Sequence, residues 1–154
     1  MPIDTIIVAT VDGCPCCGGL EDKLRLAEYR VSRQLCDLEH VEESTYGPGG
    51  FSSPEELLGW LKRNRPTENP VFSHGDCCLP NLFAANGAIS GFIDLGRSGA
   101  SDPCQDIALS WRSLRDNLAG RLGLVPAEAE PAVLFDELGI CPDWELIRYY
   151  VLLD

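Results

Sequence analysis

The sequence predicts an α+β fold that is mostly helical and contains one small β-hairpin. Apolar residues recur at helical spacing in several segments, and an Asn-Gly pair stands between two short apolar runs near the middle. The 154 residues and 45% apolar content suit one globular domain. No run of eighteen or more apolar residues is present, so we expect no membrane partner and a cytoplasmic location.

The amino-terminal half is expected to hold a leader and two helices. Residues 1–19 form the leader, and apolar residues at helical spacing over 20–35 predict the first helix. A polar loop then spans residues 37–51. Ser53-Pro54-Glu55-Glu56 is a capping box with proline at the first helical position, which predicts a second helix that ends near Pro66.

The centre of the chain is predicted to form a loop followed by a hairpin. The short apolar run Val71-Phe72-Ser73 leads into His74-Gly75-Asp76. The apolar runs 82–85 and 88–93 then flank Asn86-Gly87, which is the strongest short-range signal for a hairpin.

Helices are expected to fill the last third of the chain. Asp102-Pro103-Cys104-Gln105 has an acidic cap and glutamine three residues later, which predicts a helix that continues to about Leu118. Further helices are expected near residues 128–138 and 144–154, with Asp143 as the cap of the last one.

Two carboxylates and an amide bracket the predicted hairpin. Asn81 stands at its entry, Asp94 at its end and Asp76 on the loop before it. Because a hairpin returns its ends to one place, Asn81 and Asp94 should be neighbours, with Asp76 able to face both. Oxygen ligands suit Mg²⁺, and a third carboxylate can orient a hydroxyl and accept its proton, which is what phosphoryl transfer needs. The alternative is that these aspartates cap turns, but the order H-G-D-x-x-x-x-N, hairpin, I-D-L-G-R favours the chemistry.

Charge and cysteine content limit the classes of partner. Acidic residues outnumber basic ones by 24 to 12, which argues against nucleic acid and suits a cationic ligand, although an acidic surface also serves solubility. The 8 cysteines include the group Cys14, Cys16 and Cys17 but lack the paired spacing of structural zinc sites. We therefore expect reduced thiols, with a cysteine-rich metal-binding module as the alternative.

Several segments resemble the aminoglycoside 3′-phosphotransferase (kanamycin kinase) family. Residues 71–81 resemble its catalytic loop, residues 91–99 are similar to its metal-binding segment, and the likeness covers about 12–154. The resemblance implies that residues 12–154 form the carboxy-terminal lobe of a protein-kinase-like fold. Residues 1–11 would be a leader in place of the amino-terminal lobe, and the family's final tail would be lacking.

The resemblance also implies an activity: ATP- and Mg²⁺-dependent phosphorylation of the 3′-hydroxyl of kanamycin- and neomycin-type antibiotics, which confers resistance. It places Asp76 at the catalytic base, Asn81 and Asp94 at the magnesium ligands, and Arg97 at an arginine that organises the loop electrostatically.

Further positions match the family's supporting and drug-binding residues. His74 and Asp106 would brace the catalytic loop, although an aspartate in the first turn of a helix is also favoured by the helix dipole. Glu43, Arg112 and Asp116 would meet the aminoglycoside. The alternatives are an Arg112–Asp116 ion pair at i, i+4 on the helix surface, and a solvated loop charge at Glu43.

The sequence also departs from the family pattern. A kinase of this type needs a Gly-rich loop, a strand lysine and a glutamate that pairs with it, whereas Lys23 and Lys62 lie in helical patterns. Asn117 and Leu79 stand where some relatives place acidic drug contacts. We therefore expect little kinase activity from this chain alone. The alternatives are an inactive remnant, a weak cationic-drug-binding module, or a phosphotransferase for another small hydroxylated substrate.

Overall fold

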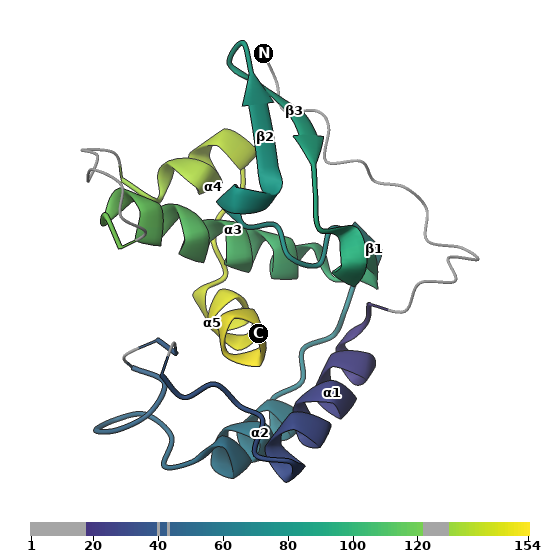
Figure 1. Ribbon diagram of the computed structural model, residues 1–154, viewed down its shortest axis with the longest axis vertical. Helices are drawn as coiled ribbons and strands as arrows, with labels where there is room; N and C mark the ends of the chain where they lie inside the picture. The colour runs from purple at the N-terminus through teal and green to yellow at the C-terminus, as the bar shows by residue number, and fades with distance from the viewer. Residues whose placement is uncertain (1–17, 40, 43, 122–129) are drawn as a thin grey trace.

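The computed structural model describes residues 18–39, 41, 42, 44–121 and 130–154, which form mostly helices and four short strands. Figure 1 shows a hairpin projecting at the top, a long helix across the middle and two helices at the bottom. The chain is therefore α+β and mostly helical, as predicted. Its elements are, in order, α1 (Leu20–Ser32), α2 (Pro54–Arg63), β1 (Val71–Ser73), β2 (Leu82–Ala85), β3 (Ala88–Phe92), β4 (Gly99–Ser101), α3 (Pro103–Leu118), α4 (Val133–Leu138) and α5 (Trp144–Leu153).

Side-chain caps begin three of the helices where the sequence places them. Ser53 accepts from the N–H of Glu56 at the start of α2 (3.3 Å), and Asp102 accepts from the N–H of Cys104 at the start of α3 (2.9 Å). Asp143 caps α5 in the same way. These bonds satisfy amides that have no partner within their own helix, which confirms the three predicted helix starts.

Two helix boundaries differ from the prediction. Helix α1 ends at Ser32 rather than near residue 35, because Gln34 adopts a left-handed conformation with φ of 57°. Helix α4 begins at Val133, and residues 128 and 129 of the predicted helix lie outside the described residues.

The strands form two separate antiparallel pairs. In the predicted hairpin, β2 pairs with β3 through a tight turn at Asn86-Gly87, where both residues have positive φ. The second pair, β1 with β4, was not predicted, since Gly-Ala-Ser has little intrinsic strand preference and gains its pairing from contact with β1. This second pair brings the predicted catalytic loop, where it leaves β1, beside the start of α3.

The hydrophobic core lies between two groups of helices. Helix α3 packs against α5, α1 packs against α2, and both α1 and α2 also contact α5. By contrast, the β2–β3 hairpin exposes Phe83, Ile89 and Phe92. Among the described residues, no helix is long and apolar enough to cross a membrane. The buried apolar residues are Leu20, Leu24, Leu57, Leu61, Ala108, Leu109, Phe135, Ile147, Tyr149 and Tyr150.

The Asp102 cap is expected to contribute more to stability than the Asp143 cap. Asp102 is buried, and its second oxygen accepts from the N–H of Asn69 (2.9 Å), so Asp102→Ala leaves two amides without an acceptor. We expect Asp102→Ala to lower the free energy of unfolding by about 2–4 kcal/mol, and the exposed cap variant Asp143→Ala by about 0.5–1 kcal/mol. Urea unfolding of both variants measures the difference, and equal losses would contradict it.

Candidate active site

A single carboxylate holds the start of the predicted catalytic loop. The part of it that follows β1, residues 74–81, is called the catalytic loop below. Asp106 on α3 accepts from the hydroxyl of Ser73 (2.8 Å) and from the N–H groups of His74 (2.7 Å) and Gly75 (2.9 Å). An ionised carboxylate is the strongest acceptor available to backbone amides, so these bonds fix where the loop leaves β1.

Three more side chains of α3 hold the rest of the loop. Gln105 donates to the carbonyl of Gly75 (2.8 Å), and Ser110 donates to the carbonyl of Cys77 (2.7 Å). The hydroxyl of Ser113 accepts from the N–H of Leu79 (3.0 Å). One side of α3 therefore follows the loop along its length, and the loop backbone is bonded from its first residue to its sixth.

The loop also rests against the segment after β3. Gly75 has φ of +83°, and a Cβ there would lie 2.1 Å from the carbonyl oxygen of Arg97, so only glycine fits. The Nε2 of His74 lies 2.9 Å from the carbonyl oxygen of Ile93, while its Nδ1 accepts from the N–H of Asp76 (3.3 Å). His74 thus joins the loop to the end of the hairpin.

Asp76, Asn81 and Asp94 lie around this junction. Asn81 donates its side-chain amide to the carbonyl of Asp76 (2.9 Å), and its own carbonyl accepts from the N–H of Ile93 (3.0 Å). The next residue, Asp94, is exposed and left-handed, with φ of 58°. Because the amide nitrogen of Asn81 is used, its amide oxygen is the atom that could face a cation beside Asp94.

Oxygen atoms from an amide and a carboxylate fit Mg²⁺ chemically. The described residues contain no group of three or more His, Cys, Asp and Glu side chains that could hold a metal ion. Cys14, Cys16 and Cys17, on which the zinc alternative rests, lie outside the described residues.

Cys78 contacts the predicted base. Its Sγ donates to Oδ1 of Asp76 at 3.1 Å. Burial raises the pKa of Cys78 to about 12, so the thiol stays protonated and remains a donor at neutral pH. Sequence reasoning treated this cysteine only as a small apolar residue, because nothing local to Cys77-Cys78 signals the contact.

Asp154 joins two of the predicted site residues. Its carboxylate pairs with Arg97 (2.8 Å) and Arg112 (2.6 Å), and its side chain is only 20% exposed. Burial alone would raise the pKa of Asp154, but the two guanidinium groups outweigh it and hold the pKa below its ordinary value. No local sequence pattern predicts this bridge, since its members lie on three separate segments.

The i, i+4 alternative for Arg112 and Asp116 is wrong. Arg112 pairs with Asp154, whereas Asp116 pairs with Arg115 (2.9 Å) and Arg121 (3.1 Å). Both predicted residues nevertheless line one large cleft of about 1120 Å³.

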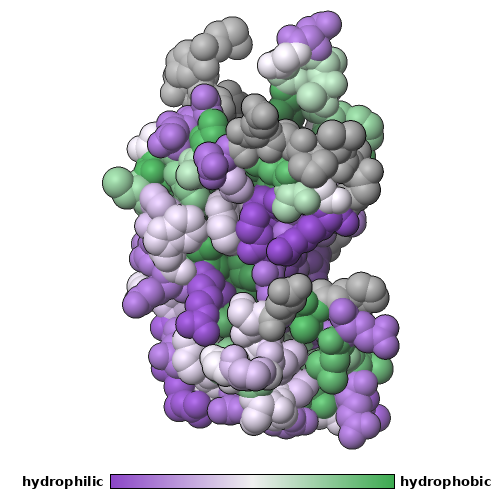
Figure 2. All heavy atoms as spheres, turned by 90° about the vertical axis from the view of Figure 1, so that its left-hand side faces the viewer, coloured by the Kyte–Doolittle hydropathy of each residue, from purple (hydrophilic) through white to green (hydrophobic). Residues whose placement is uncertain are grey.

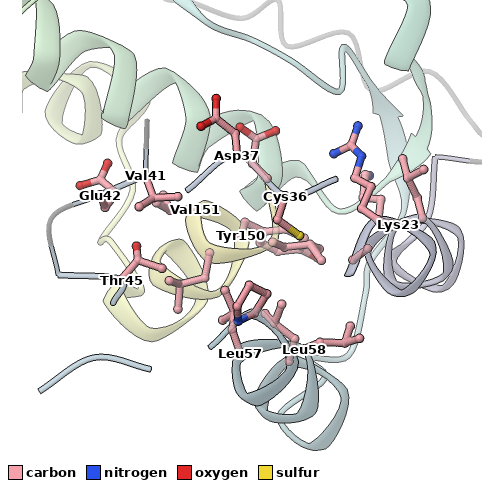
Figure 3. A pocket seen from close by; sticks show the side chains of 18 of the residues that line it. Lys23, Cys36, Asp37, Val41, Glu42, Thr45, Leu57, Leu58, Tyr150 and Val151 are labelled. Carbon is pink, nitrogen blue, oxygen red and sulfur yellow. The ribbon is translucent and has the colours of Figure 1, made fainter. Parts of the chain in front are cut away.

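The cleft lies between the two groups of helices. Figure 3 shows Lys23 of α1, Leu57 of α2 and Tyr150 of α5 around it, with Glu42 from the loop between α1 and α2. In Figure 2, hydrophilic side chains gather across the middle of the face where the molecule is hollowed. The predicted drug contact Glu43 lies outside the described residues, but Glu42 beside it lines the cleft.

Comparison with known proteins finds one matching family model and several similar proteins. The model of the phosphotransferase enzyme family matches residues 9–139. The aminoglycoside 3′-phosphotransferase of Enterococcus faecalis is 42% identical over 146 residues, which cover 94% of this chain and 51% of that protein. The streptomycin 3″-kinase of Streptomyces griseus is 35% identical over 150 residues, which cover 94% of this chain and 53% of that protein.

Solved structures show the same partial match. The crystal structure of an aminoglycoside-3′-phosphotransferase of type VIII has a TM-score of 0.78 and 29% identity, covering 95% of this chain and 54% of that one. A structure of a Streptomyces rimosus aminoglycoside phosphotransferase in complex with ADP and streptomycin has a TM-score of 0.70 at 27% identity, covering 93% of this chain and 54% of that one. The chain spans about half the length of the curated relatives it matches.

The Asp154 bridge is expected to stabilise the fold in a pH-dependent way. Because the folded-state pKa of Asp154 is lowered, its contribution is complete above the ordinary value of 3.8 and is lost as the pH falls through the folded pKa. We expect Asp154→Asn to lower the free energy of unfolding at pH 7 by about 1–2 kcal/mol.

Urea unfolding between pH 7 and pH 2.5 tests this expectation. The difference between wild type and Asp154→Asn should stay constant down to about the ordinary pKa of aspartate and shrink below it. The exposed variant Asp136→Asn on α4 is the control and should show little difference at any pH. A wild-type advantage that does not change with pH would contradict the role of ionised Asp154.

Proposed function

Because the chain belongs to the phosphotransferase enzyme family, we propose that it is the catalytic lobe of an ATP-dependent aminoglycoside O-phosphotransferase. Residues 12–154 would form this lobe. The observation that carries the proposal is the catalytic loop, whose backbone is bonded along α3 with Asp76 at its centre. The substrate would be the 3′-hydroxyl of kanamycin- and neomycin-type antibiotics, phosphorylated in the cytoplasm, and resistance would follow from it.

Asp76 would act as the base. Its backbone is held by His74 and Asn81, so the carboxylate has a defined position from which to orient the attacking hydroxyl and accept its proton. Cys78 donates to one oxygen of Asp76, which leaves the other oxygen for the substrate. Positioning of this kind supplies most of the rate in phosphoryl transfer.

Asn81 and Asp94 would hold Mg²⁺ through their side-chain oxygens. When bound, the metal would neutralise charge on the phosphates of ATP. The protein's contribution is to keep the two ligands together: the Ile93–Asn81 backbone bond extends the hairpin, so the two strands arrive at the site in a fixed register. Arg97 would set the local charge after Asp94, and its pairing with Asp154 limits where its guanidinium can go.

The cleft would receive the polycationic drug. Asp116 on α3 and Glu42 on the loop are carboxylates that line it, and the chain as a whole has a formal charge of −12. Each ammonium group of an aminoglycoside needs a charge-assisted acceptor, which such carboxylates provide. Glu43 stays a further predicted contact, and no nucleic acid partner is expected.

The lysine that contacts the phosphates of ATP would lie outside these 154 residues. The two lysines of the sequence, Lys23 and Lys62, lie on α1 and α2 rather than on a strand. Lys23 also donates to the hydroxyl of Ser101 (2.9 Å), so it supports the fold. We therefore propose that the chain by itself has little kinase activity.

The proposal predicts that activity requires an amino-terminal lobe and Asp76. Fusing the chain in frame to the amino-terminal lobe of the Enterococcus faecalis relative should give phosphorylation of kanamycin, measured by ³¹P NMR of the product. Asp76→Ala should lower kcat of the fusion by roughly 100- to 10,000-fold, because the substrate hydroxyl loses its base.

Two controls make this result specific. Asp136→Ala, on the exposed face of α4, should leave kcat within about twofold of the unaltered fusion. An aminoglycoside that lacks the 3′-hydroxyl should not be phosphorylated. Full activity of the Asp76→Ala fusion would refute the proposed base, and phosphorylation of the 3′-deoxy drug would refute the 3′ assignment.

A further inference from the structure

We propose that Arg115 is a positioning residue that holds Glu42 of the acidic loop beside Asp116 of α3, and so sets the spacing of two carboxylates that bind the ammonium groups of the substrate. This inference rests on the proposed function, because it concerns the same cleft. It assigns a role to a cation that pairs with two carboxylates of the cleft wall.

The guanidinium of Arg115 bridges the two carboxylates. Its NH2 group donates to Oε1 of Glu42 (2.6 Å), and its Nε and NH2 groups donate to Oδ1 of Asp116 (3.1 and 2.9 Å). The side chains of Arg115 and Glu42 are only 25% and 23% exposed. A forked, planar cation can serve two carboxylates at once in a fixed geometry, which lysine cannot do.

Trp111 fixes the direction of the guanidinium. The Cζ atom of Arg115 lies 5.0 Å from the centre of the Trp111 ring, one turn earlier on α3. That ring packs edge-on against Trp144 of α5 at 5.3 Å, so it is held by a second helix. The guanidinium of Arg115 is thus oriented by its stacking on Trp111 and by its bonds to the two carboxylates.

Glu42 needs such a partner because its loop has little regular structure. The loop joins α1 to α2, and Glu42 is 73 residues away from Arg115 in the chain. Positive φ values at Gly47 and Gly49 mark turns, and the described residues of the loop form one isolated bridge, between Tyr46 and Phe51. The Arg115–Glu42 bond therefore ties a long connection to a rigid helix.

The bridge leaves acceptor capacity for the substrate. The bonds from Arg115 use Oε1 of Glu42 and Oδ1 of Asp116. The second oxygen of each carboxylate lies outside these bonds. Arg121 also pairs with Asp116 but donates to the same Oδ1 atom, so Oε2 of Glu42 and Oδ2 of Asp116 are the oxygens left for ammonium groups. Two acceptors at a fixed separation favour a ligand with two ammonium groups at a matching separation.

Arg121 provides a matched control. It also donates to Oδ1 of Asp116 (3.1 Å), but its side chain is 58% exposed and it makes no ion pair with Glu42 within the described part of the chain. Arg115→Ala and Arg121→Ala each remove one positive charge beside Asp116. If charge alone mattered, both variants would bind a polycation more tightly. If Arg115 positions Glu42, Arg115→Ala should instead weaken binding of the polycation, whereas Arg121→Ala should not.

The test combines hydrogen exchange and calorimetry on the full chain. We expect Arg115→Ala to speed amide exchange in peptides that cover residues 36–52 and to weaken neomycin binding about tenfold. Arg121→Ala should leave exchange in these peptides unchanged and should leave affinity unchanged or slightly higher. In a Glu42→Gln background, Arg115→Ala should have a much smaller effect on affinity, because the bond is already lost.

Separate outcomes decide the two proposals. Unchanged exchange in Arg115→Ala, or tighter neomycin binding, would overturn the inference. If wild type binds no neomycin while exchange still rises in Arg115→Ala, the proposed function fails, and so does the substrate part of the inference, but the loop contact stands. If Arg115→Ala does not fold, Arg115→Lys gives the same test with the charge kept. Exchange should still rise, because an ammonium group lacks the planar fork that holds two carboxylates at one fixed spacing, and unchanged exchange would again overturn the inference.

Discussion

The catalytic loop depends on the hydrogen bonds that the carboxylate of Asp106 accepts. A loop that leaves a strand presents amides with no partner, and Asp106 accepts from two of them and from the hydroxyl of Ser73. With that end fixed, Gly75 can approach the backbone at Arg97 closely enough to exclude any side chain. The position of Asp76, and through Asn81 that of the hairpin, follows from this one anchored turn.

Arginine–carboxylate contacts connect elements that are distant in the sequence. Asp154 at the end of α5 ties Arg97 and Arg112 together, and Arg115 ties the long loop to α3. Exposed ion pairs add little stability, but these are partly buried and bridge two partners each, so they restrict geometry. Residues of both groups of contacts line the same cleft. The contacts help to fix the relative placement of the helices that form its walls.

Local signals predicted much of the fold and part of the site. The capping residues Ser53, Asp102 and Asp143 and the Asn86-Gly87 turn act over a few residues, so one sequence suffices to find them. Other features depend on contacts that no local pattern signals, and so were not predicted. They are strand β4, the thiol donor to Asp76, and the partners of Asp154 and Arg115. The i, i+4 rule failed for Arg112 because its guanidinium pairs with Asp154, the C-cap residue of α5, and not with Asp116 on its own helix.

The exposed apolar surface of the hairpin has a thermodynamic consequence. Strand β2 follows directly from Asn81, and β3 leads within two residues to Asp94, so the strands that carry Phe83, Ile89 and Phe92 adjoin both proposed metal ligands. Any molecule that covers this surface changes the free energy of the strand pair. Where such binding stabilises the strand pair that positions Asn81 and Asp94, it raises the affinity for a cation there, and by linkage the cation raises the affinity for the covering molecule by the same factor.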